Sequence, residues 1–428
     1  MPPTTRILIR SAKDPFLPLS PEETLAGHLL AGNTGNMLFS QAVHEILSVP
    51  GVEVVADGYV HDRVDPDPET AARIDDEYDA YVIPLANAFR PSFLDELRRL
   101  TALVQRLSIP VVVTGVGAQT TPRATRLPPE VRDDTAAFLR AVLERSARVG
   151  VRGDITRQCL ASLGFGDEHV EVIGCPSLFT PGRQAPVLRR VETLTPDSPL
   201  VATVTLSQPR MGRILQRAAE RYPHLTYVAQ RPDELRLLLR GEPVPGELDA
   251  TMPTTVDHPL YRSDRIRMFV DASTWSDYLA DRELCFGTRL HGTIAALVAG
   301  TPGFLLTFDS RTVEVADYHG FPHAPLASVS DDVDPAELFA RTDLTAFNDR
   351  RGELLGRFTT FLDDNGLDHV YRPGSANPGY AARLAAADLP GPVGPRAQPE
   401  TGRLSRLARG VVRRRPRRAQ ASDATSES

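Results

Sequence analysis

Short apolar runs alternate with helix-like segments along most of this 428-residue chain. In the first half, the runs that predict strands are residues 6–10, 52–56, 80–84, 110–114, 148–152 and 170–173. Helix-like periodicity lies between them, at residues 36–47, 92–107, 133–147 and 155–163. Because consecutive parallel strands need a crossover that is usually helical, this alternation predicts a parallel sheet covered on both faces.

A second alternation follows a polar, proline-containing stretch. Its predicted strands are residues 200–206, 225–229, 266–270, 284–286 and 303–306, with helices at 210–221, 274–280 and 293–298. We therefore expect an α/β fold of two doubly wound Rossmann-like domains that face a cleft. The expected boundaries are an N-terminal domain 1–185, a linker 186–199, a C-terminal domain 200–375 and a flexible tail rich in Pro, Gly and Arg at 376–428.

The composition, with 41% hydrophobic and 24% charged residues, is that of a globular protein. No stretch is long and apolar enough to cross a bilayer, and the first residues lack the apolar core of a secretory signal. Three scattered cysteines, Cys159, Cys175 and Cys285, suit neither a disulfide framework nor a zinc site. These features predict a cytoplasmic protein.

The formal charge of -7 is distributed unevenly. The last 28 residues carry eight Arg against one Asp and one Glu, so the rest of the chain is strongly acidic. An acidic body argues against a general nucleic-acid binder. The basic tail could lie on an anionic membrane surface, at the inner face of the plasma membrane, or stay a solvated tail, which is the simpler interpretation.

The most informative motif is Arg289-Leu290-His291-Gly292, between a predicted strand end and a predicted helix. An arginine offers a fork of donors to phosphate or carboxylate, and a histidine can act as a general acid near neutral pH. Gly292 would let a ligand approach the backbone, and Thr293 could cap the helix. The alternative is an arginine paired with an acid beside a buried core histidine.

Other polar groups follow other strand ends, where ligands bind in doubly wound sheets. They are Asn33, Gly35 and Asn36 in a Gly-Asn loop, Asn87, Gly117, Arg152, Arg210 and Arg311. Free N–H groups at the start of a helix could hold an anion beside the Gly-Asn loop. Arg210 and Arg289 could converge on one small dianion. No His-Glu-x-x-His motif or close His/Cys/Asp cluster indicates a metal.

The ordered set of motifs resembles the polysaccharide pyruvyl transferase family. The set is Gly32 to Asn36, Gly115 to Gln119, Val151 to Asp154, Gly174 to Ser177 and, above all, Gly287 to Thr293 with Gly300-Thr301-Pro302. The resemblance implies a GT-B-like fold and transfer of a pyruvyl group from phosphoenolpyruvate to a sugar of a surface polysaccharide or its precursor. The product would be a cyclic ketal, and no cofactor would be needed.

The same resemblance implies roles for individual residues. His291 would be the general acid, with Arg289 beside it in catalysis. Arg289 and Arg210 would bind the donor. From their positions near strand ends of the C-terminal domain, we expect Gly292, Thr293 and Arg311 to lie on the donor side as well. The N-terminal side would take a glycan or lipid-linked sugar acceptor, with the cleft lined by Asn33, Gly35, Asn36, Asn87, Gly117 and Arg152.

Two segments depart from the family's pattern. A glycine-rich turn usually follows the third strand, whereas residues 84–91 here read Pro-Leu-Ala-Asn-Ala-Phe-Arg-Pro, and residues 11–30 form an unusual insertion. Two other functions therefore stay open: a GT-B-like glycosyltransferase that uses a nucleotide sugar, and a catalytically silent carbohydrate-binding homologue. The sequence leaves the acceptor sugar and the oligomeric state open.

Overall fold

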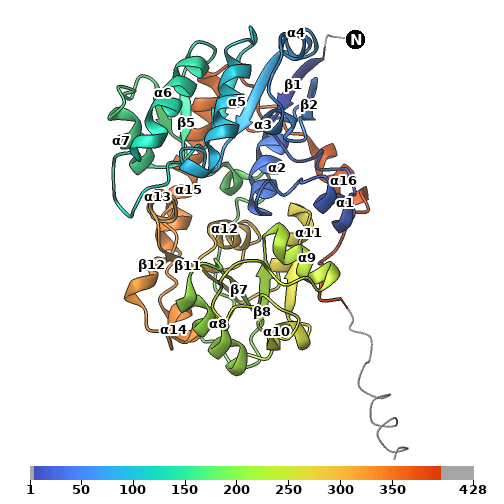
Figure 1. The fold of residues 1–428 in the computed structure, drawn as a ribbon, viewed down its shortest axis with the longest axis vertical. Coiled ribbons are helices and arrows are strands. Elements are labelled where there is room, and N and C mark those ends of the chain that lie inside the picture. The colour runs from blue at the N-terminus through green and yellow to red at the C-terminus, as the bar shows by residue number, and fades with distance from the viewer. Residues whose placement is uncertain (1–3, 397–428) are drawn as a thin grey trace, which may run out of the picture. The chain divides into compact units, whose positions relative to one another are not determined.

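The computed structural model describes residues 4–396, in which two parallel sheets are each flanked by helices (Figure 1). Residues up to 395 belong to one compact unit. The fold class predicted from the sequence, two doubly wound Rossmann-like α/β layers, is confirmed by the order of the strands.

The first sheet has four parallel strands, in the spatial order β2 (Val52–Ala56), β1 (Thr5–Ile9), β3 (Ala80–Pro84) and β4 (Val111–Thr114). A bridge from Val116 to Val151 continues it toward the parallel pair β5 (Val149–Val151) and β6 (Val170–Val172). The chain winds outward from β1 in both directions, so the strand order reverses between β1 and β3. Ligands of doubly wound sheets bind at such a switch point.

The second sheet has six parallel strands. Their spatial order is β12 (His323–Pro325), β11 (Gly303–Thr307), β10 (Leu284–Gly287), β7 (Leu200–Thr203), β8 (Thr226–Ala229) and β9 (Ile266–Met268). This order matches that of dinucleotide-binding sheets, with the reversal between β7 and β10.

Helices connect the strands of both sheets. In the first half they are α1 (Pro21–Ala26), α2 (Gly35–Leu47), α3 (Val60–Arg63), α4 (Pro68–Glu77), α5 (Leu94–Val104), α6 (Pro129–Leu143) and α7 (Asp154–Ala161). In the second half they are α8 (Pro209–Arg221), α9 (Pro232–Arg240), α10 (Pro259–Arg262), α11 (Ala272–Leu279), α12 (Leu290–Val298), α13 (Ser310–His319), α14 (Pro335–Ala340), α15 (Thr345–Asp364) and α16 (Pro378–Ala386). Short 3-10 helices lie at η1 (Pro91–Phe93), η2 (Pro176–Phe179) and η3 (Leu326–Ser328).

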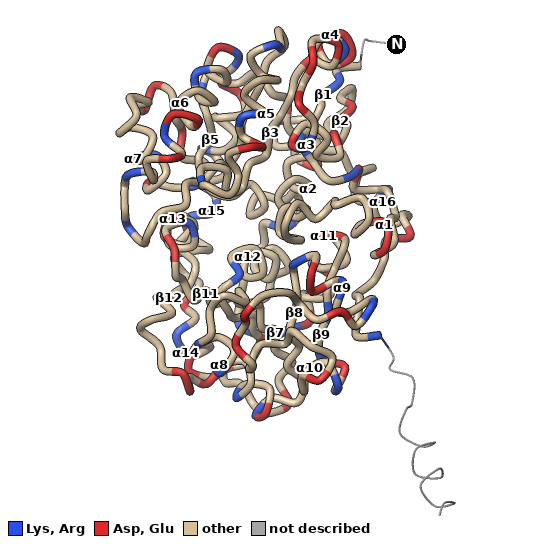
Figure 2. Tube along the Cα trace, in the orientation of Figure 1, with Lys and Arg blue, Asp and Glu red and all other residues tan. Residues whose placement is uncertain are grey.

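The central strands are apolar and fully buried, as strands covered by helices on both faces must be. Charged residues gather instead on outer helices and loops such as α4 and α6 (Figure 2). The hydrophobic effect thus fixes the sheets, and polar side chains are left for the loops that follow the strands.

The two sheets do not have separate cores. Leu38 and Phe39 of α2 share an apolar cluster with α11 and α12 beside the second sheet. In the other direction, Phe358 and Phe361 of α15 pack beside strands of the first sheet. The predicted domain boundaries therefore stay predictions, and the halves are joined by apolar packing.

The predicted flexible tail differs from the structure where the structure describes it. Residues 378–386 form α16, whose Tyr380 is buried beside His44 at 3.3 Å from its Nδ1. Val393 then pairs with Met268 of β9. The proline-rich sequence concealed these contacts, because a single buried tyrosine gives no periodic signal. The Arg-rich part of the tail lies outside the described residues. No helix in the described part of the chain is long and apolar enough to span a membrane.

Candidate active site

A cavity of about 1060 Å³ lies where the carboxyl ends of both sheets meet. Its walls include Arg10 after β1, Leu85 after β3, Thr205 after β7 and Thr288 after β10. The switch points of the two sheets therefore open into the same space. Loops after strands are where the polar side chains of such folds collect, which makes this cavity the candidate site.

The Arg-Leu-His-Gly motif forms one wall. Strand β10 ends at Gly287, Arg289 takes the N-cap position, and α12 begins at Leu290. The predicted cap is wrong: Thr293 lies inside α12 and is fully buried, without a hydrogen bond from its hydroxyl. Gly292 packs against Thr203, and neither Gly292 nor Thr293 lines the cavity, so no direct ligand contact follows for them.

His291 faces the cavity but is 91% buried, with a relative exposure of only 9%. Its ring packs so closely on α2 that a methyl group on Gly35 would lie 2.3 Å from Nδ1. Gly35 therefore packs against the imidazole of His291 and does not line the cavity. The Nε2 atom has no hydrogen-bond partner among the described residues. Its hydrogen-bonding capacity is therefore unused, and the atom is shielded from solvent.

Three arginines surround this imidazole. Burial, together with the charges of Arg152, Arg311 and Arg289, lowers the pKa of His291 to about 3. Without a ligand His291 is thus neutral at physiological pH. An anion bound among the arginines would offset their repulsion and raise that pKa.

The three guanidinium groups are poorly satisfied. Arg152 is fully buried, and both of its terminal nitrogens lack partners among the described residues. Arg289 donates from Nε to the carbonyl of Val204 at 3.1 Å, and Arg311 pairs with Asp309 at 2.9 Å. Burial lowers the pKa of both Arg152 and Arg289. Buried cations with unused donors indicate a site for an anion.

Arg210 is not part of this cluster, contrary to the sequence-based expectation. Its Nε pairs with Asp331, and Nη1 donates to the carbonyl of Leu326 at 3.1 Å. It lies on α8 outside the cavity wall. The residues after β7 that face the cavity are 205–207, in the turn that precedes α8. The arginines that line the cavity together with Arg289 therefore include Arg152 and Arg311, and not Arg210.

The Gly-Asn loop also differs from the expectation of an anion grip. The N–H of Gly35 donates to Asn33 Oδ1 at 2.9 Å, and the amide of Asn36 donates to the carbonyl of Ala31 at 2.6 Å. The loop thus satisfies its own helix start. Asn33 and Asn36 still line the cavity, and Thr34 ties the loop to the carbonyl of Gln230 at 2.9 Å. Its role is to position His291 through Gly35.

Gly117 and Asn87 take different places. Gly117 lies behind the cavity wall, where a methyl group would come within 2.5 Å of the Arg152 Cδ atom. It lets the arginine lie against the backbone, so it supports the site indirectly. Asn87 does line the cavity, next to Arg311.

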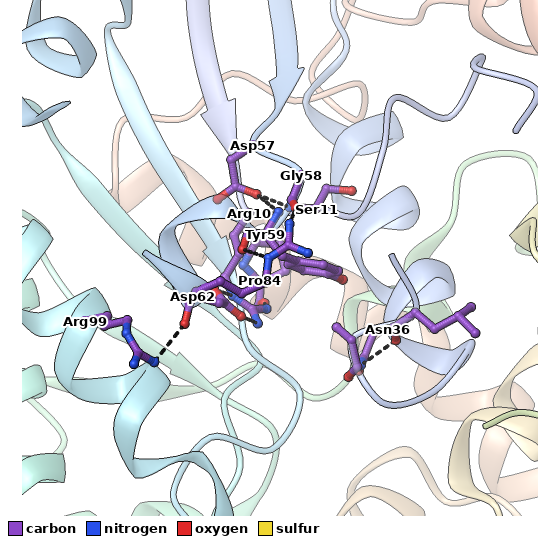
Figure 3. A network of polar contacts seen from close by, with 12 residues as sticks. Arg10, Ser11, Asn36, Asp57, Gly58, Tyr59, Asp62, Pro84 and Arg99 are labelled. Atoms are coloured by element: carbon purple, nitrogen blue, oxygen red, sulfur yellow. Dashed lines mark hydrogen bonds and ion pairs between the residues drawn. The ribbon is translucent and has the colours of Figure 1, made fainter. Parts of the chain in front are cut away.

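Sequence reasoning missed a buried ion pair on the first-sheet wall. Arg10 Nε donates to Asp62 Oδ1 at 2.8 Å, a second guanidinium nitrogen pairs with Asp62 Oδ2, and Nη1 donates to the carbonyl of Pro84 at 3.0 Å (Figure 3). The guanidinium also lies over the ring of Tyr59, 4.7 Å from its centroid. An arginine directly after the first strand was the available signal.

Removing one partner of that pair should strongly destabilise the fold. Asp62→Ala leaves the buried Arg10 without a counter-charge, so we expect a loss of about 3–5 kcal/mol in the free energy of unfolding. Asp65→Ala is the matched control, because its pair with Arg99 is exposed and should be worth at most about 1 kcal/mol. If chemical denaturation showed the same loss of unfolding free energy in both variants, the buried pair would contribute no more to stability than the exposed pair.

No group of three or more His, Cys, Asp or Glu residues in the described part of the chain could hold a metal ion. The polar side chains that line the cavity carry guanidinium groups, two imidazoles, carboxylates, hydroxyls and amides. These groups bind anions and transfer protons.

Comparison with known proteins adds a family. The sequence model of the family described as polysaccharide pyruvyl transferase matches residues 33–310, which is more than half of the chain. No curated protein matches the chain significantly.

Solved structures resemble the chain only remotely. A UDP-GlcNAc 2-epimerase of Methanocaldococcus jannaschii has 11% identity and a TM-score of 0.41, over 83% of this chain and 99% of that one. A functionally uncharacterised protein of Klebsiella pneumoniae has 11% identity and a TM-score of 0.40, over 74% and 88%. A putative UDP-N-acetylglucosamine 2-epimerase of Listeria monocytogenes has 11% identity and a TM-score of 0.37, over 83% and 90%. Similarities this remote say nothing about activity.

Proposed function

The chain belongs to the polysaccharide pyruvyl transferase family, and on that premise we propose that it transfers the pyruvyl group of phosphoenolpyruvate to a sugar. Two hydroxyl groups of one sugar residue would take up the pyruvyl carbon, forming a cyclic ketal and releasing phosphate. The acceptor would be a surface polysaccharide or its precursor, and the reaction would need no cofactor. Cytoplasmic placement, with the Arg-rich tail near a membrane surface, belongs to the same proposal.

The observation that carries the proposal is the buried imidazole of His291 within a cluster of three arginines. Phosphoenolpyruvate is a small molecule in which a phosphate and a carboxylate are attached to the same carbon. Arg152, Arg289 and Arg311 offer enough unused donors for both groups. With the anions held there, the carbon–carbon double bond of the donor would lie beside His291 Nε2.

The proposed reaction starts with proton transfer from His291 to the methylene carbon of the enol. The adjacent carbon becomes cationic and is attacked by one sugar hydroxyl. Phosphate then leaves from that carbon, and the neighbouring hydroxyl closes the ring. One hydroxyl proton replaces the proton that His291 gave up, and the other leaves with phosphate or water. The arginines stabilise the negative charge on the leaving phosphate.

The protonation state of His291 depends on the donor in this scheme. A group with a pKa of about 3 is not protonated at pH 7, and burial and the three arginines both lower the pKa of His291. A bound donor would neutralise the arginines and add its own negative charge beside the ring, which would raise that pKa. The remaining pKa is then set mainly by burial and by the donor's own charge. Donor binding would therefore charge the acid that the reaction needs.

Proton uptake on donor binding is the corresponding prediction. Because binding raises the pKa of His291, calorimetric titration at pH 7 in buffers of different ionisation enthalpy should show a proton taken up by the protein. The donor phosphate also exchanges protons, so the quantity of interest is the difference between the wild type and His291→Asn. An identical proton count in both proteins would mean that His291 stays neutral.

Ligand-dependent stability tests the function itself. Phosphoenolpyruvate should stabilise the wild type, by about 2.7 kcal/mol at one hundred times its Kd, whereas nucleotide sugars should not. The effect should be lost in Arg289→Ala. Stabilisation by nucleotide sugars alone would favour the glycosyltransferase, and a response to neither ligand would favour a silent carbohydrate-binding protein.

Gly35 offers a steric test of the position of His291. An alanine methyl 2.3 Å from Nδ1 must displace the ring, and a displacement of about 1 Å can cost on the order of 10²-fold in turnover. Gly356→Ala is the control, because Gly356 lies in α15 with open space around its Cα. It should keep full turnover and gain up to about 1 kcal/mol in stability. Steady-state kinetics would measure turnover, and melting curves would measure stability. Full turnover in Gly35→Ala would show that the position of His291 does not depend on the glycine.

A further inference from the structure

The turn between β3 and η1, residues 85–90, contains bulky and polar residues. It brings Asn87 and Arg90 into the wall of the cavity. Nothing in the proposed proton transfer uses either side chain. A guanidinium and an amide at this place give the first-sheet wall groups that can bind a ligand.

Asn87 joins this turn to the opposite wall. Its amide lies 3.0 Å from Arg90 Nη1 and 3.2 Å from Arg311 Nη1, so the oxygen faces both guanidinium groups and accepts from both. Gln119 lies against the same amide at 2.8 Å. Two cations from different sheets are thus held side by side by one neutral residue.

Arg311 pairs with Asp309 at 2.9 Å, whereas Arg90 has no ion pair with a carboxylate among the described residues. The Nε atoms of Arg90 and Arg311 are buried without a hydrogen-bond partner in the described part of the chain. Burial, and then the charge of Arg311, lowers the pKa of Arg90. A buried guanidinium with an unused donor, beside a second cation, is costly unless a ligand supplies negative charge.

Arg90 and His291 are influenced by partly different sets of charged residues. The charges that act on His291 are those of Arg152, Arg311 and Arg289. The charges that act on Arg90 are those of Arg311, Glu96 and Arg10. Because Arg90 follows β3, it belongs to the first-sheet wall, the side proposed for the acceptor.

We propose that Arg90 and Asn87 form a subsite for a carboxylate or phosphate on the acceptor sugar. This rests on the proposed function and narrows its substrate class to acidic acceptors. Such a group would accept hydrogen bonds from the guanidinium of Arg90, while Asn87 holds that guanidinium in place. The anion could be the carboxylate of an acidic sugar or the phosphate of a sugar phosphate.

The test uses the full-length protein, Arg90→Gln and the control Arg98→Gln. Arg98 is exposed and pairs with Asp134 outside the cavity. Binding of methyl glucuronide, glucose 1-phosphate and neutral methyl glucoside is measured by ligand-detected NMR without donor. Phosphate release from phosphoenolpyruvate is then measured with each sugar, and donor binding is followed by thermal shift in all three proteins.

We expect the wild type and Arg98→Gln to prefer one of the two anionic sugars, and the preferred sugar identifies the anion. Arg90→Gln should bind it roughly ten- to hundred-fold more weakly, with donor binding unchanged. Equal binding of neutral and anionic sugars by the wild type overturns the subsite. Loss of donor binding in Arg90→Gln also overturns it and makes Arg90 a donor residue. Preference for an anionic sugar without any response to phosphoenolpyruvate keeps the subsite and refutes pyruvyl transfer.

Discussion

Replacing Arg152 with methionine should stabilise the unliganded protein and abolish its response to phosphoenolpyruvate. Arg152 is fully buried, and its two terminal nitrogens have no partners among the described residues. Replacing a poorly satisfied buried charge with an apolar side chain of similar length can be neutral or can stabilise a fold by about 1–4 kcal/mol. The lost bond from Nε to the carbonyl of Gly115, 3.2 Å long, reduces that gain by about 1 kcal/mol.

The same strand offers a matched control. Arg148 precedes β5, whereas Arg152 follows it, and Arg148 pairs with Glu171 at the surface. Arg148→Met should change stability by about 0.5 kcal/mol or less and leave the donor response intact. Chemical denaturation with and without phosphoenolpyruvate measures both quantities. If Arg152→Met lowered stability and kept the donor response, Arg152 would be a structural residue.

Turnover should fall by roughly 10²–10⁴-fold in His291→Asn, while donor binding remains. Asparagine cannot supply the proton for the methylene carbon. The arginines that would hold the anions are untouched by the substitution. The measurement is the single-turnover rate of phosphate release, with donor affinity determined in parallel.

His319→Asn separates chemistry from stability. His319 is also buried, with a pKa lowered to about 3, and its Nε2 accepts a hydrogen bond from the N–H of Cys175 at 2.9 Å away from the cavity. Its loss should lower the melting temperature without slowing the chemical step. If both histidine variants lost turnover in proportion to their stability, His291 would have no role as an acid.

The sequence predicted the sheets well because buried parallel strands are short continuous apolar runs. Two strands, β2 and β3, have the predicted bounds, and the other predicted strands differ by a few residues at their ends. Strand β12 was not predicted. Arg289, His291, Arg152 and Arg311 line one cavity because each directly follows a strand or starts a helix at the same edge of its sheet.

What the sequence could not show depends on partners distant in the chain. Arg210 was expected in the cavity, but Asp331 pairs with it elsewhere. Arg10 and Asp62 are far apart in sequence, and neither predicts the other. The depressed pKa of His291 likewise arises from burial and from three arginines, which lie after β5, at the start of α12 and in the first turn of α13. The spacing of residues along the chain does not predict such contacts, because the partners do not belong to a common sequence motif.

In the proposed reaction, a pyruvyl group moves from phosphoenolpyruvate to a sugar. Carbon-13-labelled phosphoenolpyruvate, incubated with the protein and glycans of its host, tests it most directly by mass spectrometry. The account predicts label in a glycan ketal, one phosphate released for each pyruvyl group gained, and no label with His291→Asn. Unlabelled glycans that gain a sugar from a nucleotide sugar instead would contradict it.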